Sequence, residues 1–130
     1  MAWADLRKHL LLWILGVGGI AVSVAVILIL KDRFDELGRV NATEEVVRRL
    51  AAALPLRAGG PPSSVEARQR ALPRIAQLAL PPEYVQNGHI YDAWNRELRV
   101  TFDRLGGAEV RSAGSDGRFD TADDLTAVAR

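Results

Sequence analysis

The longest hydrophobic pattern in this chain is an uncharged run near its beginning. Residues Leu10 to Leu30 include no charged side chain. As a helix rising about 1.5 Å per residue, these 21 residues would extend roughly 31 Å, the thickness of the hydrocarbon layer of a bilayer. The apolar core of a cleaved signal peptide is shorter, at about 7–15 residues. The run therefore predicts an uncleaved transmembrane helix at residues 10–30, preceded by a short flank at residues 1–9.

After the apolar run, hydrophobic positions recur every three or four residues up to residue 54, which is the spacing of one helix face. Five basic and five acidic residues share the segment and suit a solvated opposite face. We expect an extended amphipathic helix at residues 31–54 that continues the membrane helix. Asn41 to Glu44 leave two alternatives open, one continuous helix or two abutting helices. The apolar positions are Phe34, Leu37, Val40, Val47, Leu50 and Leu54.

Proline and glycine then predict a linker at residues 55–64, with Pro55 expected to end the helix. Ser63 or Ser64 is the expected cap of a second helical segment at residues 65–80. Pro73 is expected to kink or restart that segment.

Two short runs alternate between apolar and polar residues in the last third of the chain, at residues 98–102 and 108–112. The turn between them carries Gly106 and Gly107, so we expect a hairpin. The predicted fold class is therefore α+β, with a transmembrane helix, an amphipathic extension and a small antiparallel sheet in a head at residues 65–130.

Composition narrows the range of functions. The net charge of +1, without a basic stripe, argues against nucleic acid as a partner. The absence of cysteine excludes disulfides and thiolate metal sites. Only about 100 residues remain outside the lipid, enough for one small domain. The two histidines are His9, at the membrane edge, and His89, in a turn without a nucleophile motif beside it. We expect a loop or packing role for His89, no enzymatic activity and no small-molecule substrate.

An acidic, glycine-containing loop at residues 112–125 is the main candidate site. Its carboxylates and tight turns are of the kind that bind Ca²⁺ through oxygen. Asp116, Asp123 and Asp124 would supply charge, and carbonyls near Ala113 and Arg118 would complete the shell. The spacing does not fit an EF-hand. An ordinary solvated acidic turn is the alternative, and the spacing alone leaves both open.

The order of motifs over residues 80–125 resembles a known family. The motifs follow one another in this order: Leu80-Pro81, Tyr91 to Leu98, a hairpin, Ser112-x-Gly114-x-Asp116-Gly117 and Asp123-Asp124-Leu125. This order is similar to the G-type major pseudopilin of type II secretion, the general secretion pathway protein G-like family. The resemblance implies a pseudopilin-like head ending in a calcium loop, with Asp116, Asp123 and Asp124 as side-chain ligands and loop carbonyls beside them. Asp120 has no firm counterpart in the family pattern.

Two departures from the family pattern stand out. Asn95-Arg96-Glu97 follows Trp94 where the family has Gly-Asn-Pro. The prepilin cleavage signal and the glutamate within the apolar helix are also missing. We therefore expect a chain that keeps its amino terminus and stays in the bilayer rather than a bulk filament subunit.

These patterns together predict a structural or assembly component of a type II secretion or type IV pilus-like system. Its expected place is the inner membrane, crossed once, with the carboxy-terminal domain in the periplasm. Its expected partners are the membrane and other pseudopilins or secretion and pilus assembly proteins. The alternative is an anchored extracytoplasmic binding module of unrelated role that uses a calcium-stabilised head.

Overall fold

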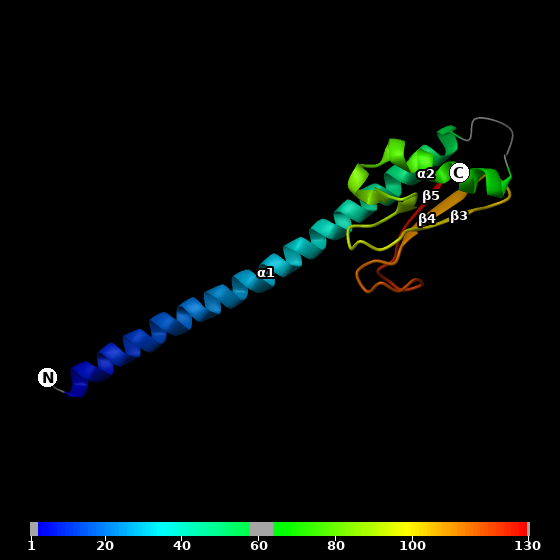
Figure 1. Ribbon diagram of the computed structural model, residues 1–130. Helices are drawn as coiled ribbons and strands as arrows, with labels where there is room; N and C mark the ends of the chain where they lie inside the picture. The colour runs from blue at the N-terminus through cyan, green and yellow to red at the C-terminus, as the bar shows by residue number, and fades with distance from the viewer. Residues whose placement is uncertain (1–2, 58–63, 130) are drawn as a thin grey trace. The chain divides into compact units, whose positions relative to one another are not determined.

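The computed structural model describes residues 3–57 and 64–129 and has the predicted α+β class (Figure 1). The chain divides into two compact units, Met1–Glu36 and Leu37–Arg130, each considered by itself below. In chain order the elements are α1 (Trp3–Arg57), α2 (Val65–Ala79), the 3-10 helix η1 (Pro82–Tyr84), β1 (Val85–Gln86), β2 (His89–Ile90), β3 (Arg99–Phe102), β4 (Ala108–Ser112) and β5 (Leu125–Ala129).

The first unit consists of the amino-terminal part of α1. It carries the apolar part of the one helix, among residues 3–57 and 64–129, that is long and apolar enough to cross a membrane, and none of the most apolar window of that helix is buried. Ser23 donates its hydroxyl to the carbonyl of Gly19 at 2.9 Å, which satisfies a polar group inside the apolar stretch. A Cβ added at Gly16, Gly18 or Gly19 would meet nothing within 4 Å. Each of these positions is therefore open to close approach by another helix.

In the second unit, α1 contributes one buried face to the head. Of the two alternatives left open at Asn41 to Glu44, the structure has the continuous one, since α1 runs through this segment as one helix. Phe34, in the first unit, and Leu37 do not join the buried face, since they remain 69% and 58% exposed. The buried residues of α1 are Thr43, Val46, Val47, Leu50, Ala51 and Leu54.

The predicted linker lies between the end of α1 and the start of α2. Pro55 does not end α1, which continues to Arg57. Ser64 is confirmed as the N-cap of α2, and its Oγ accepts a hydrogen bond from the Ala67 amide at 3.3 Å. Helix α2 contains Pro73 without a restart. The middle of the predicted linker, residues 58–63, lies outside the described residues.

The strands β3, β4 and β5 form an antiparallel sheet with β4 at its centre (Figure 1). The predicted hairpin is confirmed, with β4 at its expected bounds and β3 one residue shorter than expected. The third strand, β5, was not predicted. Val110 on β4 is fully buried against the α1 face, so the centre of the sheet and the helix share one core.

A second, two-stranded hairpin joins β1 and β2. Its turn residues, Asn87 and Gly88, both have positive φ values, 52° and 82°. Asn-Gly is the preferred pair for this type of two-residue turn. The dipeptide is thus a local signal for a hairpin that the sequence analysis did not use.

One partly buried hydrogen bond joins α1 to the segment after β2. Thr43 is fully buried, and its Oγ1 accepts a hydrogen bond from the Ala93 amide at 3.0 Å. A buried N–H without an acceptor is costly, so this contact fixes where the segment crosses the helix.

Replacing Thr43 by valine keeps the side-chain shape but removes the acceptor for the Ala93 amide. We expect Thr43→Val to lower the free energy of unfolding by about 1–3 kcal/mol. The exposed Thr101 offers a matched control, since Thr101→Val should change stability by less than about 0.5 kcal/mol. Denaturant unfolding of the full chain in detergent micelles measures both, and equal effects would contradict the role given to Thr43.

Candidate functional site: the acidic loop after β4

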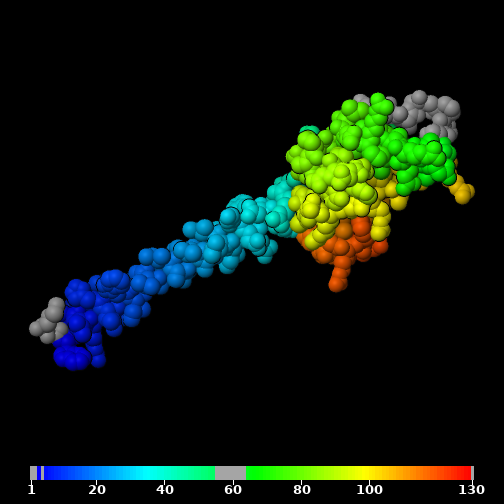
Figure 2. Space-filling view, in the orientation of Figure 1, coloured from blue at the N-terminus to red at the C-terminus, as the bar shows by residue number. Residues whose placement is uncertain are grey.

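The candidate calcium loop lies between β4 and β5 and appears in orange on the surface of the head in Figure 2. The structure places all the predicted site residues on this loop but in different environments. Ala113 is buried, Asp116 and Arg118 are exposed, and Asp123 and Asp124 are partly buried.

Two glycines permit the path of the loop. Gly114 and Gly117 have φ values of +62° and +70°, which side chains rarely adopt. A Cβ on Gly114 would lie 2.1 Å from the carbonyl oxygen of Asp123. A Cβ on Gly117 would lie 2.7 Å from Cζ of Arg96. Both positions therefore need glycine for backbone conformation and for space.

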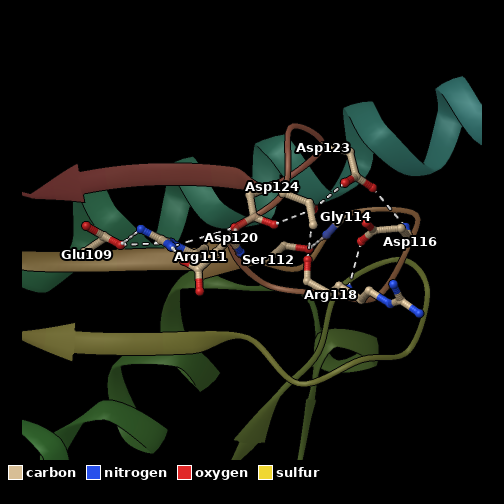
Figure 3. A network of polar contacts seen from close by, with 10 residues as sticks. Glu109, Arg111, Ser112, Gly114, Asp116, Arg118, Asp120, Asp123 and Asp124 are labelled. Atoms are coloured by element: carbon tan, nitrogen blue, oxygen red, sulfur yellow. Dashed lines mark hydrogen bonds and ion pairs between the residues drawn. The ribbon is translucent and has the colours of Figure 1, made fainter.

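Asp123 accepts hydrogen bonds from three neighbours within the loop, and the one from Asp116 is drawn in Figure 3. Its Oδ2 accepts from the Asp116 amide at 2.9 Å and from the Ser115 hydroxyl at 3.0 Å. Its Oδ1 accepts from the Thr121 hydroxyl at 2.6 Å. The Thr121 hydrogen bond, followed by the Asp116 amide, holds the pKa of Asp123 well below its usual range, because these donors favour the ionised carboxylate.

Arg111, a residue of β4, faces Asp120 and Asp124 of the loop (Figure 3). Nη1 of Arg111 lies 2.7 Å from Oδ1 of Asp120 and 3.7 Å from Oδ2 of Asp124. The Asp120 amide donates to Oδ2 of Asp124 at 2.8 Å. Arg111 also pairs with Glu109 at 2.7 Å. Asp120, which has no counterpart in the family pattern, thus has a structural contact here.

The carbonyl groups of the loop also have donors. Oγ1 of Thr121 lies 3.0 Å from the Arg118 carbonyl, an alternative acceptor for the one hydroxyl proton that Asp123 accepts at 2.6 Å. The carbonyls of Gly114 and Ser115 accept from Nη1 of Arg96 at 2.7 and 3.1 Å. Oxygens that a calcium ion would use therefore already face hydrogen-bond donors of the chain.

The oxygen ligands suit calcium chemically, but their arrangement does not gather them around one point. Within residues 3–57 and 64–129, no three acidic or histidine side chains form a group that could hold a metal ion. Asp116 uses its Oδ1 to accept from the Arg118 amide at 2.8 Å, away from the Asp124 carboxylate (Figure 3). A calcium shell of six to eight oxygens would need these contacts to be exchanged. The calcium ion stays a prediction of the sequence.

Behind the loop lies a buried carboxylate that the sequence analysis did not single out. Asp92 is only 3% exposed, and its Oδ2 accepts from the hydroxyl of the fully buried Ser112 at 2.8 Å. The same Ser112 oxygen accepts from the Gly114 amide at 3.2 Å. Asp92, Arg96 and Arg111 contact the loop from outside it, so the spacing within the loop gave no sign of them.

His89 has a partner that the sequence analysis did not expect. Its Nδ1 lies 2.6 Å from Oε1 of Glu97, and the two side chains are 56% and 58% exposed. Glu97 also forms a backbone bridge with Tyr91, next to β2. The pair joins two neighbouring segments at the surface, where water weakens such a contact. The absence of enzymatic activity remains a prediction.

No protein-family model, curated protein or solved structure matches this chain. The likeness to the G-type pseudopilins therefore rests on the order and spacing of the motifs.

The depressed pKa of Asp123 predicts a loss of stability in acid. A carboxyl group whose pKa is lower in the folded state than its unfolded value of about 3.9 stabilises the fold at a pH above about 3.9. This stabilisation is lost as the pH falls from that value through the folded-state pKa. We expect the melting temperature of the full chain to fall from pH 5 to pH 2, and Asp123→Asn to be less stable at pH 7 and less sensitive to acid. Asp116→Asn, with the same charge change in the same loop, should retain the wild-type pH dependence. Parallel pH profiles for wild type and Asp123→Asn would contradict this assignment.

Proposed function

We propose that this protein is a membrane-anchored structural or assembly component of a type II secretion or type IV pilus-like system. One observation carries the proposal. Helix α1 supplies both an uncovered apolar stretch and the buried face of the head. A helix whose apolar side chains are all exposed in water would be unstable, and lipid removes that cost. The chain is thus suited to hold a small head at a membrane.

The chemistry of the head supports a structural role. Its most buried polar side chains bond to other parts of the head: Thr43 to the Ala93 amide, and Ser112 to Asp92. Such satisfied contacts stabilise a fold and leave few buried groups poised for a reaction. The order of motifs along residues 80–125, which resembles that of the G-type pseudopilins, supports the choice of secretion or pilus system.

The proposed partners are the membrane and other pseudopilins or assembly proteins with a helix in the same membrane. Gly18, Ala21 and Ala25 leave one side of the apolar helix small, so a second helix can approach closely. We propose the inner membrane as the location, with the head on the periplasmic side, because the resemblance implies a cytoplasmic amino terminus. The charged residues on both flanks of the apolar stretch do not decide the orientation.

The topology can be tested by fusing reporters after the last residue of the full chain. A reporter active only in the periplasm should give signal, and one active only in the cytoplasm should not. Alkaline carbonate should leave the protein in the membrane pellet, and detergent should release it. The opposite reporter pattern would show the reverse topology, and release of the protein by carbonate would contradict the proposed membrane anchor.

The membrane partner can be tested with a photo-activatable side chain at one position of the apolar helix. We expect Ala21 to give crosslinks to another membrane-anchored assembly protein in native membranes. Ile27, which projects from the side opposite Gly18 on an ideal helix, is the matched control and should give few. Crosslinks to lipid alone at both positions would overturn the assembly role and favour the anchored binding module.

A further inference from the structure

The turn after β2 fixes the backbone of Arg96 beside the acidic loop. Oδ1 of the buried Asp92 accepts hydrogen bonds from the amides of Trp94 and Arg96, both at 2.9 Å. The Asp92 amide in turn donates to the Arg96 carbonyl at 2.8 Å. These contacts close the turn, so the starting point of the Arg96 side chain is determined by the core of the head.

From this position the guanidinium group reaches the first turn of the loop. Its Nη1 donates to the carbonyls of Gly114 and Ser115, at 2.7 and 3.1 Å. Hydrogen bonds from a charged donor are about twice as strong as neutral ones. Gly117 leaves the space that the guanidinium occupies, since a Cβ there would lie 2.7 Å from both Cζ and Nη1 of Arg96.

Carboxylates and inward carbonyls on a short loop create a negative potential that needs a cation nearby. In this chain two arginines from outside the loop provide positive charge. Arg96 contacts the carbonyls, and Arg111 contacts Asp120 and Asp124. We infer that Arg96 is the cation that holds the first turn of the loop in place, so that the loop folds without a bound metal. The inference does not depend on the proposed function.

This inference and the calcium prediction lead to opposite expectations for the melting temperature when calcium is removed. If calcium closes the loop, removing it should lower the melting temperature of the protein, because a ligand that binds only the folded state stabilises it. If Arg96 closes the loop, chelation should leave the melting temperature unchanged, and loss of the guanidinium should lower it.

The experiment uses the full chain in detergent micelles, with either EDTA or millimolar calcium. Wild type should melt within about 1 °C in the two buffers, whereas Arg96→Met should melt about 5–10 °C lower in both. Amide exchange, followed by NMR, should become at least about tenfold faster at Asp116 and Arg118 in Arg96→Met, because their hydrogen bonds lie within the loop. Arg104→Met is the control, since it removes a charge from an exposed arginine outside the loop and should behave as wild type.

Two results would overturn the inference. A fall of several degrees for wild type in EDTA would assign the role to a metal, and an Arg96→Met protein with wild-type exchange would show that the guanidinium is dispensable. If Arg96→Met does not fold, Arg96→Lys keeps the charge but not the planar group. We expect Arg96→Lys to fold, with an amide exchange rate at Asp116 between the rate of wild type and that of a fully open loop. A wild-type exchange rate in Arg96→Lys would contradict a specific need for arginine.

Discussion

The head depends on satisfying one buried carboxylate. Removing an ionised carboxyl group from water costs several kcal/mol unless donors replace the lost water. Asp92 is almost fully buried, and its two oxygens accept from two backbone amides and the Ser112 hydroxyl. Because Ser112 ends β4 and Arg96 reaches the acidic loop, these bonds locate the sheet, the turn and the loop together. The neighbouring Ala93 amide bonds to Thr43, which adds α1 to the same network.

The elements that could be predicted are those with a strong local pattern. Helical periodicity identified Val47, Leu50 and Leu54 as buried, and alternation identified β4. Strand β5 was missed because its buried position, Ala129, is small and its alternation is weak. Asn87 and Gly88 did carry a local signal for the first hairpin, but it was read as an ordinary turn.

The sequence predicts where the candidate site lies but not which residues outside the loop contact it. The glycines and aspartates of the loop identified it, and Asp116, Asp123 and Asp124 all lie there. The groups that contact it come from elsewhere in the chain: Arg96 is 18 residues from Gly114, and Asp92 is 20 residues from Ser112. No periodicity along a sequence reports such pairs, since only the fold decides which distant residues meet.

The long-range contacts of Thr43 also constrain the order in which the chain can mature. Its hydrogen-bond partner, Ala93, follows 50 residues later, and β5 is the last of the described elements to leave the ribosome. The apolar part of α1 emerges much earlier and can enter the membrane while most of the head is still unsynthesised. The buried face of α1 then has no sheet to cover it, and contacts between residues far apart in sequence form slowly. During that interval the face from Val46 to Leu54 is uncovered, so in a chain anchored as proposed, membrane insertion would precede tertiary folding.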